Sequence, residues 1–216
     1  MNKFKRFTAF FLFTAIILGL YGCGLGGNAK YKVVDTIDKQ QFCIAFRKDD
    51  KSADFVIAKL QELQETGDVH KLALKWFGED RIILAGDAKA FKNLKEKPEK
   101  REYNIGYDGG RLPYSGDDKL GRPTGFDVEL AKLVCSELKW KAKFIPIDVS
   151  QAEVELNSGN VDCVWGALGY DQENEEIRQS PVYMNNEVIV ASLAGSKVRS
   201  IGSLRGKTLT VGSNKY

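Results

Sequence analysis

Two pairs of neighbouring carboxylates are the residues that could support acid/base chemistry. Asp162 with Asp171, and Glu153 with Glu155, lie close together in the sequence. Acidic residues near the ends of predicted strands and helices are mostly solvated or cap a helix, rather than exchanging protons with a substrate. The stretch Gly106–Gly110 also lacks the spacing of a phosphate-binding glycine loop. The sequence therefore predicts a protein without catalysis of its own.

Cysteine and histidine offer little for a metal site or a nucleophile. Cys43, Cys135 and Cys163 each lie among apolar residues, and His70, the single histidine, falls in a helical pattern. None of them has the CxxC or Cys/His spacing of a zinc site. We expect the three cysteines to be small buried hydrophobic residues, and we expect no metal and no cofactor.

Cys23 carries a different chemistry, which is lipid attachment. Three basic residues among the first six precede an apolar stretch from Phe7 to Gly22. This stretch is shorter than the roughly 20 residues of a membrane-spanning helix, and a small residue before the cysteine suits processing. The pattern predicts a lipoprotein signal over residues 1–22 and a lipid on Cys23; an uncleaved anchor helix is the alternative. We therefore expect a protein anchored by lipid on the extracytoplasmic face of the cell membrane.

Charge and length narrow the class of protein further. The formal net charge is +3, and three positive charges lie within residues 1–22. The remainder is close to neutral, so charge gives no reason to expect a nucleic-acid partner. About 190 residues remain, enough for one α/β domain, which we expect to be monomeric.

The elements that must position any site fall into two groups separated by a charged segment. After a tether at 23–30, the expected elements are strands at Tyr31–Val34 and Phe42–Phe46 and helices at Ser52–Gly67 and Asp68–Gly78. Residues 81–102 are rich in lysine and predict a solvated linker; a basic patch facing the membrane is the alternative.

From Tyr103 onward, strands and helices alternate. We expect strands at Asn104–Tyr107, Lys143–Ile147, Val161–Trp165, Val188–Leu193 and Thr208–Val211, helices starting at Asp127 and Ser150, and one helical turn at Glu175–Arg178. Asp127 is expected to cap its helix. This alternation predicts an α/β fold with a mostly parallel sheet flanked by helices.

Several segments resemble a known family. They are GRPTGFDVELA at Gly121–Ala131, GNVDCVWGAL at Gly159–Leu168, PVYMNNEVIV at Pro181–Val190, SLRGKTLTVGSN at Ser203–Asn214, FCIAFRKDD at Phe42–Asp50 and TGDVHKLALKWFGED at Thr66–Asp80. Together they resemble the bacterial extracellular solute-binding proteins of family 3, the polar amino-acid type of ABC importer. The resemblance implies a lobe of the periplasmic-binding-protein type II kind.

The order of these segments differs from the family's order. Residues 31–80 resemble the C-terminal part of lobe one, with its return strand and final helices, yet they precede residues 103–202, which resemble its N-terminal part. The segment 81–102 would join the two, and residues 203–216 resemble the start of a second lobe. The resemblance thus implies a circularly permuted and truncated form, with the second lobe largely missing.

The resemblance also implies a ligand pocket in loops beyond the carboxyl ends of the strands. The residues implied are Asp108, which would receive a ligand ammonium group, with Arg111, Tyr114, Trp165, Gly166, Ala167, Gly169, Asp171 and Asn174. The family usually places a carboxylate-binding arginine where this chain has Glu173 and Asn174. Arg178 and Arg111 are the candidate replacements.

The function implied is that of a solute-binding protein for an ABC permease, with a small polar ligand such as an amino acid. We expect free amino acids to bind weakly or not at all, because one lobe alone cannot close around a ligand; the absence of the usual arginine adds doubt about amino-acid recognition. A sensory or partner-binding lobe, and a fragment without binding activity, are the alternatives.

Overall fold

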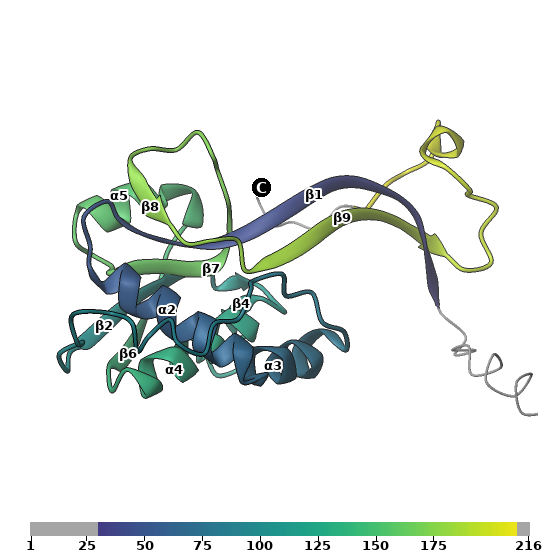
Figure 1. Cartoon of the computed structure of the whole chain (residues 1–216). Helices are drawn as coiled ribbons and strands as arrows, with labels where there is room; N and C mark the ends of the chain where they lie inside the picture. Colours follow the sequence, from purple (N-terminus) through teal and green to yellow (C-terminus); the bar gives the residue numbers. More distant parts are fainter. Residues whose placement is uncertain (1–29, 211–216) are drawn as a thin grey trace, which may run out of the picture. The chain divides into compact units, whose positions relative to one another are not determined.

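The computed structural model describes residues 30–210, which form two compact units. The larger unit holds residues 36–188 and 208–210, and the smaller holds residues 30–35 and 189–207. Two strands that pair with each other, β1 (Tyr31–Arg47) and β9 (Met184–Leu193), contribute residues to both units (Figure 1). Within the described part of the chain, no helix has the length and apolar character needed to span a bilayer.

A six-stranded sheet forms the centre of the larger unit, in the order β6-β2-β7-β1-β8, with β9 paired to β1. The strands not yet placed are β2 (Glu102–Tyr107), β6 (Lys141–Pro146), β7 (Cys163–Gly169) and β8 (Ile177–Gln179). β2 runs parallel to β6 and β7, whereas β1 runs antiparallel to β7 and β8. The expected α/β class is confirmed, but the sheet is mixed rather than mostly parallel, because β1 opposes its neighbours.

Helices cover both faces of this sheet. The helices are α2 (Ser52–Glu65), α3 (Asp68–Phe77) and α4 (Phe126–Glu137), with η1 (Val149–Gln151) leading into α5 (Ala152–Asn157). The first three pack into one core cluster and α5 packs into another on the opposite face (Figure 1). In α2, the buried Val56, Leu60 and Leu63 recur at helical spacing and form the face that meets the core.

Successive residues of β1 contribute to opposite faces of the sheet. Phe42, Ile44 and Phe46 belong to the core under α2, α3 and α4, whereas Ala45 packs with α5. None of these four residues is more than 1% exposed. Full burial of a large apolar side chain contributes roughly 1.5–3 kcal/mol. β1 is therefore an interior strand of the fold and not an addition to its edge.

Two predictions about secondary structure are wrong because of the way β1 runs and pairs. β1 is one continuous strand, although the sequence predicted separate runs at 31–34 and 42–46. The helical turn expected at Glu175–Arg178 is wrong, because Ile177–Gln179 forms a strand against the far edge of β1. A strand there satisfies backbone groups of β1 that an isolated helical turn would leave unpaired.

A small sheet precedes α4 and fixes where that helix begins. It consists of β3 (Gly110–Arg111), β4 (Ser115–Asp117) and β5 (Pro123–Thr124). Gly125 follows with φ of 120°, and a Cβ there would lie 2.4 Å from the carbonyl oxygen of Tyr114. Only glycine fits this position. The prediction that Asp127 caps α4 is wrong: Gly125 is the N-cap, and Asp127 lies in the first turn, fully buried.

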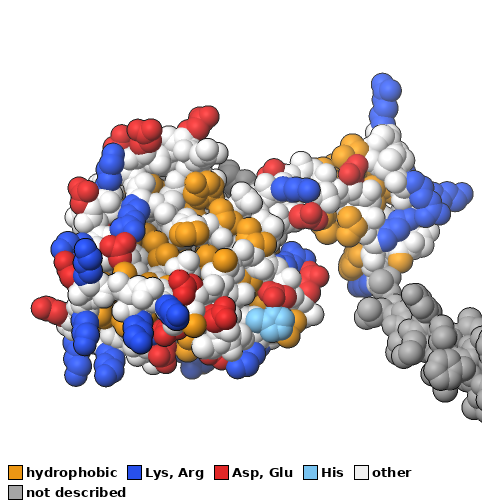
Figure 2. All heavy atoms as spheres, viewed as in Figure 1, with side chains coloured by type: hydrophobic (Ala, Val, Ile, Leu, Met, Phe, Trp, Pro, Cys, Tyr) orange, Lys and Arg blue, Asp and Glu red, His pale blue; other side chains and the backbone are white. Residues whose placement is uncertain are grey.

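The segment 81–102, expected to be a solvated linker, is largely exposed but is attached to α2. The amide of Asp87 donates to the carbonyl of Gln61 at 3.1 Å. The Lys59 ammonium lies 4.0 Å from the centre of the Phe91 ring. On the face of the larger unit seen in Figure 2, basic side chains are interspersed with acidic ones. That face presents mixed charge and not a continuous basic patch.

The smaller unit contains the outer ends of β1 and β9 and the 3-10 helix η2 (Ile201–Leu204). The Lys32 ammonium donates to the carbonyl of Ser196 at 2.7 Å. The strand expected at Thr208–Val211 is wrong for residues 208–210, which are irregular, because no strand among the described residues pairs with them. Val211 lies outside the described residues.

Candidate functional site

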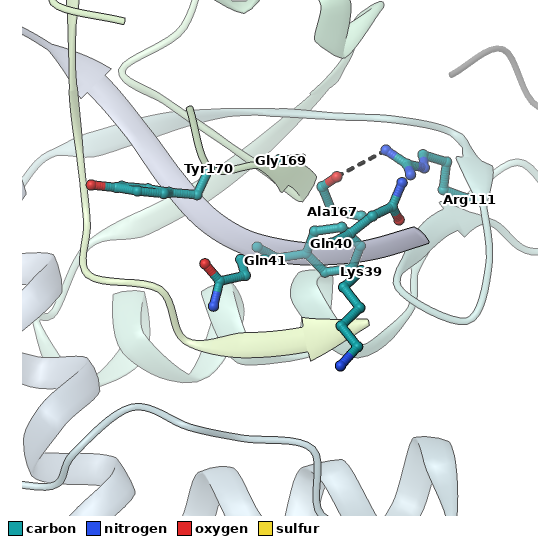
Figure 3. Close-up of a pocket in the computed structure, with 8 residues that line it drawn as sticks. Lys39, Gln40, Gln41, Arg111, Ala167, Gly169 and Tyr170 are labelled. Carbon is teal, nitrogen blue, oxygen red and sulfur yellow. Dashed lines mark hydrogen bonds between the residues drawn. The ribbon is translucent and has the colours of Figure 1, made fainter. Parts of the chain in front are cut away.

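A pocket of about 370 Å³ lies beside β1 and the end of β7 (Figure 3). It is lined by Lys39, Gln40, Gln41 and Phe42 of β1, Arg111 of β3, Ala167 and Gly169 of β7, and the following Tyr170. Small-molecule sites have volumes of this order. The parallel strands β2 and β7 end at one edge of the sheet, so the loops beyond them meet there.

Arg111 brings positive charge into the pocket. Its Nη1 donates to the carbonyl of Ala167 at 2.8 Å, and its guanidinium carbon lies 5.9 Å from the centre of the Phe42 ring. Figure 3 shows the Lys39 side chain extending away from Arg111. The pocket is lined by eight of the described residues, and none of the eight carries a carboxylate. The pocket thus suits a ligand that carries a carboxylate of its own.

Polar side chains of β1 are held by hydrogen bonds from neighbouring elements. The Asn186 side-chain amide donates to the Gln40 side-chain oxygen at 2.8 Å, and the Tyr114 hydroxyl donates to Asn186 Oδ1 at 2.6 Å. The backbone amide of Tyr170 donates to the Gln41 carbonyl at 2.7 Å. These bonds fix the β1 side of the pocket against β9 and the end of β7.

A buried carboxylate contacts the backbone of the pocket wall. Asp127 accepts hydrogen bonds from the Tyr183 hydroxyl and from the Ala167 amide, each at 2.7 Å. Burial raises the pKa of Asp127 to about 7, while both hydrogen bonds and the charge of Arg111 act in the opposite direction. Ala167 has φ of 55°, in the left-handed region that residues other than glycine rarely adopt.

Three of the nine residues implied by the family resemblance line this pocket, namely Arg111, Ala167 and Gly169. Gly166 is buried just before Ala167, and a Cβ at Gly166 would lie 3.0 Å from the amide nitrogen of Asp108. Glycine here lets β7 approach the end of β2 closely.

Three other implied residues make contacts that do not line the pocket. The Asp108 carboxylate accepts from the Gly110 amide at 2.8 Å and so closes its own loop. Tyr114 packs edge-on against Phe42, with ring centres 5.1 Å apart. Trp165 is 1% exposed and belongs to the core.

The loop after β7 holds the last two implied residues. The side chains of Asp171 and Asn174 each accept a hydrogen bond, at 3.0 Å, from the backbone amide two residues further along. Both side chains therefore stabilise the turn. Arg178, one candidate replacement for the missing arginine, pairs with Asp54 at 2.5 Å and does not line the pocket. Arg111, the other candidate, does.

The sequence did not point to Tyr170 or to the residues that β1 contributes. Except for Phe42, the residues that β1 contributes precede the apolar run Phe42–Phe46, where the expected strand began. One signal was available, which is the polar pair Gln40 and Gln41 directly before a core strand. A strand that enters the sheet antiparallel to β7 brings its first residues to the edge where β7 ends.

The remaining reactive residues behave as structural groups. Cys43, Cys135 and Cys163 are buried and free, as expected, and burial raises the pKa of Cys43 and Cys135 to about 12. Asp162 accepts hydrogen bonds from two arginines, Arg47 and Arg101. Across residues 30–210, no cluster of His, Cys, Asp and Glu side chains could hold a metal ion.

Half of the residues that line the pocket lie in a segment that matches a known family. Residues 103–201 match the model of the bacterial extracellular solute-binding proteins, family 3. This segment is therefore similar to that family over somewhat less than half of the chain. The matched residues include Arg111 and the end of β7, whereas β1 lies outside the match.

Curated solute-binding proteins show the same similarity. The chain is 25% identical over 126 residues to the probable amino-acid-binding protein YxeM of Bacillus subtilis, covering 56% of this chain and 47% of the relative. It is 25% identical over 131 residues to the lysine/arginine/ornithine-binding periplasmic protein of Escherichia coli, covering 60% and 50%. The chain thus spans about half the length of these relatives.

Solved structures of substrate-binding proteins also align with part of the chain. One is an ABC uptake transporter substrate-binding protein from Streptococcus pneumoniae with bound histidine, 30% identical with a TM-score of 0.32, covering 33% of this chain and 29% of that one.

Proposed function

We propose that the chain is a lipid-anchored extracytoplasmic solute-binding protein of an amino-acid-type ABC importer, which binds a small polar ligand without catalysis. The observation that carries the proposal is the pocket at the end of β7, half of whose lining lies in the segment that matches the family 3 model. The similar proteins of Bacillus subtilis and Escherichia coli are named for amino-acid binding.

The charge of the pocket defines how a ligand would bind. The charged lining residues are Lys39 and Arg111, so the carboxylate of a ligand would face Arg111. A guanidinium offers several donors, and one of them already serves the Ala167 carbonyl. We expect weak affinity, since the lining of this pocket contains a single arginine that is partly engaged.

The position of β1 supports a rearranged order of the family's segments. β1 lies in the interior of the sheet between β7 and β8, and α3 packs with α4 in the same core. We infer that residues 31–80 complete the lobe begun by residues 103–202, with residues 81–102 as the connection.

The lipid anchor has its own test. Cys23 lies outside the described residues, and the proposal of lipidation rests on the sequence before it. Labelled palmitate fed to bacteria expressing the protein should be incorporated into the wild type and not into Cys23→Ser. Equal incorporation in both would contradict the anchor.

Ligand binding is tested by titrating the ¹⁵N-labelled protein with single amino acids, glutamate, glutamine, lysine and histidine, and following backbone amide signals. Signals of Gln41, Arg111 and Gly169 should move with millimolar affinity for at least one of them. Arg111→Gln should weaken that binding at least about tenfold, because a charge-assisted bond is lost.

Arg178→Gln is the matched control, because Arg178 pairs with Asp54 and does not line the pocket. It should leave the affinity unchanged. If no pocket signal moves with any of the four amino acids, or if both arginine variants bind equally well, amino-acid binding at this pocket is wrong.

A further inference from the structure

The backbone of Ala167 is held from both sides in a conformation that it would not adopt by itself. A non-glycine residue in the left-handed region costs roughly 1–2 kcal/mol. Its amide donates to Asp127 and its carbonyl accepts from Arg111. The strained residue is therefore the link between a buried carboxylate and the arginine of the pocket.

We propose that Asp127 is a positioning residue for the pocket: its carboxylate orients the Ala167 peptide so that the Ala167 carbonyl fixes the Arg111 guanidinium. This inference rests on the proposed function, because it concerns the same pocket. Asp127 itself does not line the pocket and would not touch the ligand.

The second oxygen of the carboxylate connects to the opposite wall. Oδ1 of Asp127 accepts from the Tyr183 hydroxyl, and the Tyr183 amide donates to the Phe42 carbonyl at 3.0 Å. One side chain on α4 therefore links β7, through Ala167, with β1, through Tyr183. A carboxylate can accept from two donors at once, whereas an amide side chain in its place offers one acceptor and one donor group.

Burial explains why this arrangement is specific rather than incidental packing. Asp127 is fully buried, and leaving an ionised carboxylate in such a place without partners is strongly unfavourable. The ionisable side chains that act on it are Tyr183, Arg111 and the partly buried Tyr114. Only Arg111 among them carries a positive charge, and it reaches Asp127 through the peptide that both groups hold.

The test follows the Ala167 amide of the ¹⁵N-labelled protein, which requires no ligand. In Asp127→Asn, the exchange of the Ala167 amide hydrogen should accelerate at least about tenfold, because a neutral amide oxygen replaces the charged acceptor and bonds more weakly, while the amide of Ile105 in β2 stays protected. The Arg111 signal should also move in Asp127→Asn, and adding Ala167→Gly should return it toward its wild-type position, because glycine adopts the left-handed region without strain.

Asp162→Asn is the matched control, since Asp162 is a mostly buried carboxylate bound to Arg47 and Arg101. It should leave the Ala167 amide unchanged. Unchanged exchange at Ala167 in Asp127→Asn, or equal acceleration in both variants, would overturn the proposal.

A wild-type measurement covers the case in which Asp127→Asn does not fold. The Ala167 amide shift should titrate with the same midpoint as the Asp127 carboxyl carbon, near pH 7. The reason is that the hydrogen bond from the Ala167 amide becomes charge-assisted when Asp127 ionises. An Ala167 amide that does not respond through this titration would also overturn the proposal. Failure of ligand titration with the Ala167 response intact would contradict only the proposed function.

Discussion

At the scale of single residues, the site depends on groups whose partners are distant in the sequence. Asp127 is the clearest case, because local spacing predicted a helix cap, whereas its hydroxyl partner Tyr183 lies 56 residues away. Arg111 was one of two candidate replacements for the family's arginine, and the structure places it at the pocket while Arg178 pairs elsewhere. Local patterns identified these residues, but only the fold distinguishes their roles.

The ionisation of Asp127 should make stability depend on pH. Its pKa lies at about 7 in the folded chain, above the ordinary value of 3.8, so the folded state keeps a proton that the unfolded state has lost. The Asp127 contribution to the free energy of unfolding should therefore fall between about pH 4 and pH 7 and level off above. At roughly 1.4 kcal/mol per pKa unit, the fall is at most about 4 kcal/mol.

Urea unfolding of the wild type and Asp127→Asn across pH 4–8 measures this contribution. The difference between the two proteins should change with pH over that window, because the variant cannot ionise at this position. Parallel pH profiles would show that Asp127 ionises at its ordinary pKa.

At the scale of elements, the start of α4 is set by one glycine. Gly125→Ala should lower the free energy of unfolding by at least about 2 kcal/mol, because the added Cβ meets the Tyr114 carbonyl and the backbone is strained. Gly121→Ala is a matched comparison: Gly121 also has positive φ, but a Cβ there meets nothing within 4 Å. It should cost roughly 1 kcal/mol. Equal unfolding midpoints in urea for the two variants would refute the role of the close contact.

At the scale of the whole described chain, residues on both sides of the segment 81–102 share one hydrophobic core. Phe42 and Leu60 come from the first side, and Leu130 and Trp165 come from the second. Neither side can bury its apolar residues without the other. The segment 81–102 is attached to α2, and it adds Leu84 to the core, with Ile82 and Phe91 packed against it.

Cutting the chain within this segment should therefore leave the fold assembled. A protease site inserted between Lys92 and Asn93 should be cleaved, and the two fragments should elute together in gel filtration without denaturant, because β1 remains between β7 and β8. The same protein without protease is the control. Fragments that separate under native conditions would show that the connection is needed for the fold.

Sequence patterns predicted the α/β class and the parallel strands, because those signals are local. They also pointed to Arg111, Ala167 and Gly169 through motifs of the family. They missed Gln40 and Gln41, whose place in the pocket depends on where β1 pairs with β7, and they misread residues 175–178 for the same reason. Long-range pairing of one strand accounts for most of what the sequence did not reveal.

The three buried thiols also provide built-in probes of local opening. The reactive form of cysteine is the thiolate, which is scarce for Cys43 and Cys135, because burial raises their pKa to about 12. Labelling at either position must await exposure of that part of the core. Cys43 lies on β1, before the segment 81–102, and Cys135 lies on α4, after it. The labelling rate at each thiol therefore measures how often the element that carries it opens, separately for the two parts of the chain.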